Sequence, residues 1–170
     1  MSIDVDLTAV VDPDVDVRVA DQRSELARPH GVVIATIAVG GGIGASFRYG
    51  VSQLLPTLPG HFPGGTFLIN VLGCFLIGVL MVLITEVWSA HRLLRPFFGV
   101  GILGGFTTFS TYALEANDLL HFGAVGLSIA YLGGTLIGAM LAVIIGMWAT
   151  RKVVSLIFDR VEISWAGGKE

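Results

Sequence analysis

Glycines and small hydroxyl residues interrupt a hydrophobic segment of the sequence at residues 99–112, which read GVGILGGFTTFSTY. Glycine, threonine and serine are poor helix formers, and the hydroxyl groups compete for backbone hydrogen bonds. We therefore predict a break in the helix at this stretch. In hydrocarbon, a broken helix leaves N–H and C=O groups unpaired, so it persists only where it is buried in protein or lines a polar cavity. The stretch indicates a functional site at membrane depth.

Asn70 is the one strongly polar residue in a second apolar run, residues 66–85. Its amide offers two donors and an acceptor, which are costly to leave unpaired in lipid, so we expect it to face protein or water. Hydrogen bonding between helices and donation to a ligand both fit this residue. Phe109 and Tyr112 are three residues apart and share a face if a helix resumes after the break. Aromatic residues at that spacing are more often packing residues.

Composition places these residues in a membrane protein. The chain has 170 residues, of which 54% are apolar and 14% charged, and its mean hydropathy is +0.80. We predict an all-α membrane protein with four transmembrane helices, because four apolar segments are long enough to cross about 30 Å of hydrocarbon. These segments cover about 31–54, 66–86, 96–118 and 123–148, within a channel domain of residues 31–152. Residues 1–30 are predicted to be an acidic disordered tail, and residues 153–170 a cytoplasmic C-terminal tail.

Two further sets of polar residues lie in the apolar segments. Ser128, Tyr131 and Thr135 are spaced three and four residues apart, so they form one stripe on the fourth segment. A polar stripe on an otherwise apolar helix more often points inward than toward lipid. Arg48 lies near the far end of the first segment. A snorkelling arginine and an arginine at the mouth of an anion path both fit this position.

Glycines spaced four apart create faces on which another helix backbone can lie closely. Gly40 and Gly44 form such a face on the first segment, and Gly134 and Gly138 on the fourth. Four spans enclose too little volume for a pore within a single chain, and these faces need a partner. A dimer is therefore the simplest arrangement. Glycine faces of one chain can also satisfy one another, and the sequence leaves that alternative open.

The distribution of charge predicts the orientation of the chain. With four spans both termini lie on one side, together with the connection after residue 86. That side carries nine Lys and Arg residues, against only Arg48 at the opposite end. The positive-inside rule therefore predicts cytoplasmic N and C termini. Nothing in the charges indicates a nucleic-acid partner, and the single cysteine, Cys74, excludes an intrachain disulfide.

Three motifs resemble those of the CrcB, or Fluc, family of fluoride channels. They are GGGIGASFRY at residues 40–49, GGTFLINVLGCFLIG at residues 64–78 and GILGGFTTFSTY at residues 101–112. The resemblance covers roughly residues 31–150. It implies a fluoride-selective passive ion channel that lowers cytoplasmic fluoride by efflux through the cell inner (plasma) membrane, and it implies no enzymatic activity. The family fold is an antiparallel dimer of four-helix subunits with two narrow pores and a structural sodium ion at the interface.

The resemblance also implies roles for individual residues. Asn70 donates to fluoride, Phe109 matches the first pore-lining phenylalanine, and Tyr112 stands where the family commonly has a second phenylalanine. An amide and the positive edge of an aromatic ring both suit an anion that must pass without being held tightly. Arg48 matches a vestibule arginine. The sodium ion is held by backbone carbonyls at positions matching Gly104 and Thr107. A polar track along the pore comprises Ser110, Thr111, Tyr131 and Thr135.

One conflict concerns the subunit composition. An antiparallel homodimer needs copies in both orientations, whereas the strong Lys and Arg bias favours one. The hypothesis that follows is a heterodimer with an oppositely oriented paralogue.

Three other functions were weighed. A proton-coupled small multidrug exporter usually needs a membrane-embedded carboxylate, which the first segment lacks. An intramembrane hydrolase using Ser110 would need a His or Lys at similar depth. A non-conducting subunit of a membrane assembly would leave Asn70 and the break without a purpose.

Overall fold

The computed structural model describes residues 30–87 and 93–166, with side chains for residues 31–87 and 93–158. The chain divides into two units, Met1–Val32 and Val33–Glu170. The predicted acidic tail, except for its last residue, lies outside the described residues.

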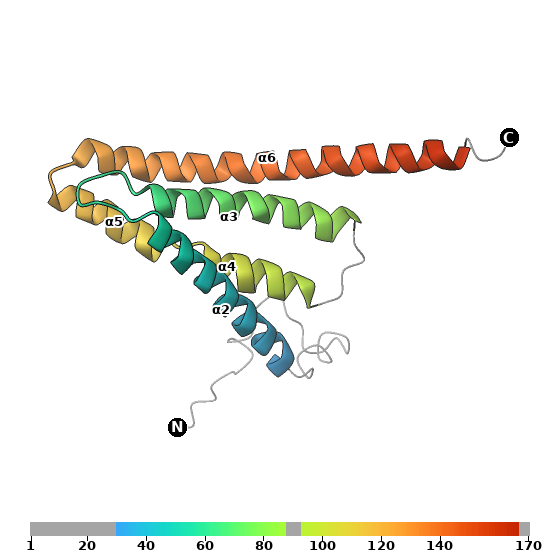
Figure 1. The fold of residues 1–170 in the computed structure, drawn as a ribbon, viewed down its shortest axis with the longest axis horizontal. Coiled ribbons are helices and arrows are strands. Elements are labelled where there is room, and N and C mark those ends of the chain that lie inside the picture. The colour runs from blue at the N-terminus through green and yellow to red at the C-terminus, as the bar shows by residue number, and fades with distance from the viewer. Residues whose placement is uncertain (1–29, 88–92, 167–170) are drawn as a thin grey trace, which may run out of the picture. The chain divides into compact units, whose positions relative to one another are not determined.

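Every regular element in the described part of Val33–Glu170 is helical (Figure 1). Four stretches are long and apolar enough to cross a membrane: Gly31–Leu54, Gly64–Val87, Arg95–His121 and Val125–Phe158. The predicted helical class and the four spans are therefore confirmed. The elements are α2 (His30–Leu54), α3 (Gly64–Val82), the π-helical η2 (Leu83–Val87) and η3 (Arg95–Leu103), α4 (Gly104–Phe106), α5 (Ser110–His121) and α6 (Val125–Ala166).

The fourth helix is longer than the predicted segment. α6 contains 42 residues and continues well past residue 148 to Ala166. At about 1.5 Å of rise per residue this helix is roughly twice as long as the hydrocarbon is thick. Part of α6 therefore lies beyond the hydrocarbon, and residue 153, the predicted start of the tail, falls inside a continuous helix.

The glycine face of α2 is covered by the same chain. A Cβ atom added at Gly44 would collide with the backbone of Ile102, and one added at Gly40 would collide with the carbonyl of Phe97. From the other side, a Cβ at Gly105 would collide with the Gly41 carbonyl. The backbones of α2 and of the η3–α4 segment are thus in direct contact because both carry glycine there. These faces therefore do not need a second subunit. Here the glycine faces of one chain satisfy one another, which is the alternative to a dimer that the sequence left open.

A second glycine contact joins α3 and α6, which run side by side (Figure 1). A Cβ at Gly78 would collide with the Val143 carbonyl, and a Cβ at Gly146 with the Phe75 carbonyl. Gly138 faces side chains of α3, whereas Gly134 has open space around its Cα. The close approach of these two helices fixes their register along the rest of their length.

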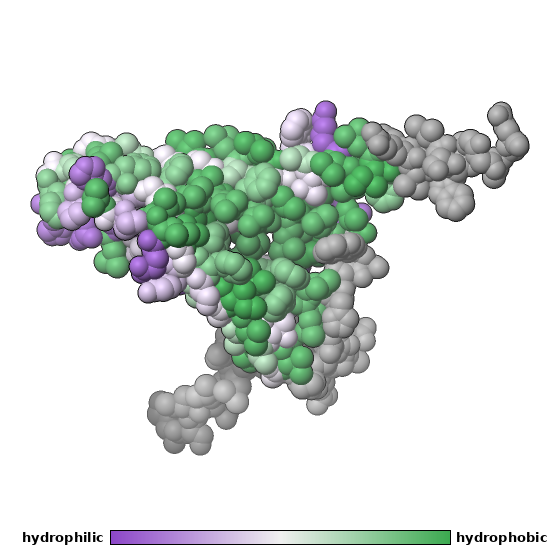
Figure 2. Space-filling view, viewed as in Figure 1, coloured by the Kyte–Doolittle hydropathy of each residue, from purple (hydrophilic) through white to green (hydrophobic). Residues whose placement is uncertain are grey.

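Apolar residues cover most of the visible surface, and hydrophilic residues gather toward the end where the α2–α3 and α5–α6 connections lie (Figure 2). On α6, large side chains are more than half exposed over several turns. This exposure suits lipid as the surrounding medium, because contact with hydrocarbon carries no hydrophobic cost. The residues concerned include Leu136, Ile137, Met140, Ile144 and Ile145.

Candidate functional site

A cavity of about 410 Å³ lies between α3, the α4–α5 junction and α6. It contains five of the residues that the sequence marked for function, namely Asn70, Thr107, Phe109, Tyr112 and Thr135. The other lining residues are Cys74, Ile77, Thr108, Leu136 and Ala139. The cavity therefore brings together residues from the motifs at 64–78 and 101–112 and from the fourth segment.

The junction between α4 and α5 is held by Asn70. α4 ends at Phe106 and α5 begins at Ser110, and Thr107 is extended, with a ψ of 158°. The Asn70 side-chain N–H donates to the Thr108 carbonyl at 2.9 Å, and the Thr108 N–H donates to the Asn70 side-chain oxygen, also at 2.9 Å. This reciprocal pair satisfies both backbone groups of a nearly buried residue. Asn70 thus has a structural role as well as a position on the cavity.

The Thr108 hydroxyl organises the start of α5. It accepts a hydrogen bond from the Thr111 N–H at 3.2 Å and donates to the Thr111 hydroxyl at 3.1 Å. The Ser110 hydroxyl lies 3.3 Å from the same oxygen. A side-chain oxygen that accepts from an early helix N–H satisfies one of the donors that a helix start leaves unpaired. Ser110 and Thr111 therefore belong to this capping network, and neither lines the cavity.

Thr135 is the unsatisfied polar group of the cavity. Its side chain is only 5% exposed, and its hydroxyl has no hydrogen-bond partner among the described residues. A buried hydroxyl without a partner carries a free-energy cost, so an unpaired one in a native site calls for an explanation such as a bound molecule. Thr135 and Asn70 line the same cavity from α6 and α3. A small ligand that enters it therefore meets polar groups from both helices.

Phe109 and Tyr112 differ in their surroundings. Phe109 is 79% exposed, and its ring centroid lies 5.8 Å from that of Tyr112. The Tyr112 hydroxyl donates to the Leu132 carbonyl of α6 at 2.8 Å. The sequence left open whether this hydroxyl bonds elsewhere or alters the cavity, and the structure places it against a backbone carbonyl.

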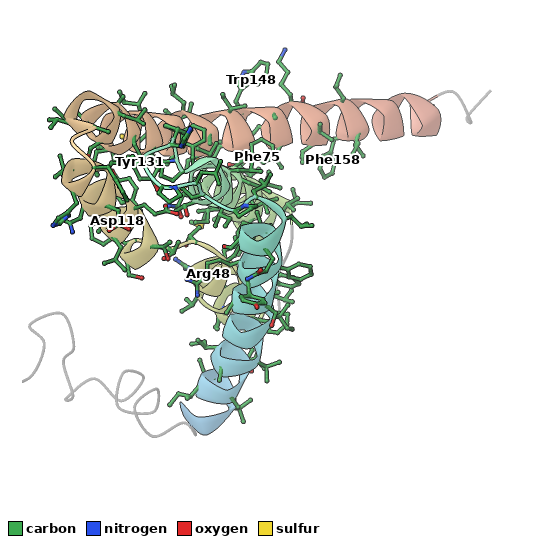
Figure 3. All side chains as sticks on the ribbon, turned by 60° about the vertical axis from the view of Figure 1, so that its left-hand side comes forward. Arg48, Phe75, Asp118, Tyr131, Trp148 and Phe158 are labelled. Carbon is green, nitrogen blue, oxygen red and sulfur yellow. The ribbon has the colours of Figure 1, made fainter. Side chains whose placement is uncertain are left out.

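Tyr131 is fully buried in the core, between α6 and α5 (Figure 3). Its hydroxyl donates to the Glu115 carboxylate at 2.8 Å, and its ring packs 5.2 Å from that of Tyr112. It does not line the cavity that contains Asn70. Glu115 also accepts a hydrogen bond from the Thr57 hydroxyl at 3.3 Å. This carboxylate joins the α2–α3 connection to α5 and α6.

Arg48 and Gly104 lie away from the cavity. Arg48 is half-buried and projects from α2 (Figure 3), while Gly104 is exposed, and a Cβ added there would lie 3.9 Å from the Gly99 carbonyl oxygen. Among the described residues no group of three or more His, Cys, Asp or Glu side chains could hold a metal ion.

The sequence did not identify Thr108 as the hydrogen-bond partner of Asn70. The two residues are 38 positions apart, and any of several groups in the predicted break could have bonded to the amide. The usable signal was the pairing of one buried amide with one interrupted helix, because each leaves hydrogen-bonding groups that the other can satisfy. That signal predicts contact between the two segments, but it does not identify the residue.

Four helices are long and apolar enough to span a membrane, and three of these spans line a mostly apolar cavity that carries a few polar groups. These features define a multi-pass membrane protein. A family model described as "CrcB-like protein, Camphor Resistance (CrcB)" matches residues 35–147, which include the whole cavity. The chain belongs to this family.

Several relatives of this chain are named as fluoride-specific ion channels. Fluoride-specific ion channel FluC 2 of Nocardia farcinica is 57% identical over 119 residues, or 70% of this chain and 85% of the relative. FluC 1 of Streptomyces coelicolor is 51% identical over 127 residues, 75% of this chain and 82% of the relative. FluC of Agrobacterium fabrum is 44% identical over 121 residues, 71% of this chain and 97% of the relative.

Proposed function

We propose that this chain forms a passive, fluoride-selective ion channel. The observation that carries the proposal is a cavity that is lined both by Asn70, which Thr108 holds in place, and by Thr135, whose buried hydroxyl has no partner among the described residues. The names of the relatives support fluoride as the ion. A channel that is open to fluoride lets the anion leave the cytoplasm down its electrochemical gradient, without a coupled energy source.

Asn70 is suited to replace water around a small anion. Its side-chain nitrogen carries two N–H groups, of which one is used by the Thr108 carbonyl. The second is the donor that we propose for fluoride. Because both ends of the amide are anchored to Thr108, the donor cannot rotate away when the ion leaves. Fixed donors that replace the hydration shell are how channel filters stabilise an ion while still releasing it.

The remaining cavity residues supply weaker contacts. The Thr135 hydroxyl can donate from the opposite wall, and the rings of Phe109 and Tyr112 can turn a positive edge toward an anion. Arg48 would attract anions to the vestibule, and Ser110, Thr111 and Tyr131 would act on the path only through their contacts with Thr108 and Tyr112. Several weak sites in sequence allow both entry and exit of the ion.

The α4–α5 junction lies at mid-membrane in this proposal. The nine residues of η3 and the three of α4 precede it, and the twelve of α5 follow it. The whole span, Arg95–His121, is long enough to cross the hydrocarbon. Equal helical lengths on the two sides therefore support a central depth for the Thr108 backbone.

A second subunit in antiparallel orientation would complete the pathway. The support is that one chain does not close the cavity: its lining residue Phe109 is 79% exposed, so a second chain would be needed to enclose the path on that side. The excess of Lys and Arg on the side of the termini supports cytoplasmic N and C termini and an oppositely oriented paralogue as the partner. Two numbered relatives, FluC 2 and FluC 3, come from the same strain of Streptomyces avermitilis. Paralogues therefore occur together in this family.

A structural sodium ion would be held by the Gly104 and Thr107 carbonyls. The donor set fits a hard cation, which prefers oxygen ligands. Gly104 is exposed, and the extended Thr107 turns its carbonyl out of the helical direction. One chain supplies two such carbonyls, and two chains that meet at this junction would supply four. The ion would neutralise carbonyl groups that the interrupted helix leaves without helical partners.

The test is fluoride efflux from liposomes that contain the purified chain, alone and together with an oppositely oriented paralogue. We expect Asn70→Asp and Phe109→Ile to abolish most of the flux. Asn70→Asp keeps an acceptor for the Thr108 N–H but removes the donor and adds a charge that repels anions. Ile137→Ala, on an exposed side chain of α6, is the matched control and should conduct normally.

Flux from the paralogue pair but not from either chain alone would support the heterodimer. Flux from this chain alone, with its termini labelled on both faces of the membrane, would contradict the heterodimer and leave the channel proposal standing. No flux from folded protein in either arrangement would contradict the channel proposal.

A further inference from the structure

Cys74 is the only cysteine in the chain and lines the same cavity as Asn70. It follows Asn70 by four residues on α3, so the two side chains share a helix face about 6 Å apart along the axis. The thiol is half-buried, and the cavity reaches on past it to Ile77. The cavity therefore extends from the level of Asn70 along α3 toward the Val82 end of that helix.

The opposite wall is apolar toward this end. α6 contributes Thr135 and, one turn later, Ala139; Gly138, next to Ala139, packs against Val71 and Phe67 of α3, so Ala139 lies near the level of Asn70. Ile77, the lining residue beyond Cys74 on α3, is also apolar. The thiol of Cys74 is thus the hydrogen-bonding side chain that the lining offers to an ion leaving Asn70 in this direction. A thiol is a weak donor, which suits a transient contact.

An independent observation marks this cavity as a place for a ligand. The Thr135 hydroxyl is buried, lines the cavity and has no partner among the described residues. A buried hydroxyl without a protein partner can be satisfied by an ion or a water molecule but not by a lipid chain. A thiol on the facing wall then has access to the same water.

We propose that Cys74 lines the ion pathway as its second donor and is a modification site for small thiol-reactive compounds that close the pathway. This inference rests on the proposed function. With a methanethiosulfonate, the Cys74 thiolate attacks the sulfenyl sulfur of the reagent, and a new S–S bond forms. The S–S bond of the reagent breaks, methanesulfinate leaves with the electron pair, and the thiol proton goes to water. The attached group then occupies the cavity one turn from Asn70.

The experiment uses the full chain in liposomes, either alone or with the paralogue, in whichever of these two arrangements conducts fluoride. Anionic sulfonatoethyl methanethiosulfonate is added, flux is recorded, and the mass of the protein is measured in the same samples. We expect modification of most of the protein and an about tenfold loss of flux, since a blocked pathway leaves only the unmodified fraction to conduct. Fluoride in excess should slow the modification, because it competes for the same cavity.

Three variants separate a pathway residue from a packing residue. Cys74→Ala should become insensitive to the reagent and lose flux by about threefold, the size of effect expected for one weak hydrogen bond. Cys74→Ser, which restores a donor, should recover that flux. In Cys74→Ala with Leu76→Cys, the thiol lies on an exposed position of α3 outside the cavity. That thiol should react slowly in lipid, because the reactive thiolate needs water. Adding the reagent should therefore not change the flux of this double variant from its value before the addition.

Modification of Cys74 without loss of flux would overturn the inference, as would a Leu76→Cys thiol that reacts as fast as Cys74. Both results leave the proposed channel function intact. Absence of flux from every unmodified sample would instead count against the proposed function, while the rate of modification and its protection by fluoride would still show whether the thiol faces an anion-accessible cavity.

Discussion

The contact between α3 and α6 has two halves with opposite properties. In the half that contains Gly78 and Gly146, each glycine lies against a backbone carbonyl of the other helix and leaves no room for a methyl group. In the half that contains Asn70 and Thr135, the same two helices enclose a cavity of about 410 Å³. Of two neighbouring parts of one helix pair, one is thus tightly packed and the other lines a cavity. These are called the closed half and the hollow half.

The difference shows how a small membrane protein holds an open site. Where the helices touch through glycine, backbone contacts set their distance and register. Where they carry Asn70 and Thr135, that fixed spacing leaves a polar space that the side chains do not fill. Changes in the closed half should therefore affect stability first, whereas changes in the hollow half should affect ion flux first.

Gly146→Val tests the closed half and should have the largest effect. The added atoms meet the Phe75 carbonyl, which is backbone and cannot turn aside. We expect a loss of about 3 kcal/mol or more in the free energy of unfolding. Thermal unfolding in detergent measures this loss. Gly126→Ala, at a glycine with open space around it, is the control and should be neutral or stabilising by up to about 1 kcal/mol. Equal stability of the two variants would contradict the closed contact.

Asn70→Ala lies on the boundary between scaffold and site. It removes both hydrogen bonds to Thr108 and leaves a nearly buried N–H and C=O to find other partners. We expect a loss of about 2 to 3 kcal/mol together with loss of flux. Backbone amide exchange at Thr108 should accelerate in this variant. Unchanged exchange would show that Asn70 does not hold the α4–α5 junction.

Tyr112→Phe removes one hydroxyl and keeps the ring. The hydroxyl donates to the Leu132 carbonyl, so its loss should cost about 0.5 to 1.5 kcal/mol. Fluoride flux should stay within about twofold of the original, because the ring edge toward the cavity is unchanged. A large fall in flux at normal stability would place the hydroxyl itself on the ion path.

Thr135→Val should have the smallest effect on stability and a clear effect on flux. The hydroxyl has no partner among the described residues, so replacing it with a methyl group should leave the free energy of unfolding unchanged or raise it by up to about 1 kcal/mol. Parallel measurements of unfolding and of liposome flux check whether the variant loses flux while keeping its stability. A destabilised variant with full flux would show that Thr135 belongs to the scaffold.

The site residues were predictable to different degrees. Asn70 and the break at residues 99–112 stand out in an apolar sequence, because polar groups in hydrocarbon require partners. The partner itself was not predictable, since Thr107, Thr108 and Ser110 offer similar groups within four residues. The destination of the Tyr112 hydroxyl depended on which carbonyl of α6 lay opposite, and that is a matter of helix register.

The sequence by itself determined the four helical spans, because apolar stretches of this length can satisfy most of their backbone groups in lipid only as helices. It also determined which polar residues would lie among them. Only the tertiary structure decided that the glycines of α2 pair with η3 and α4 within the chain, and that Asn70 meets Thr108. The physical reason is that close contacts depend on the distance and register between helices, and these arise from the packing of all four spans together.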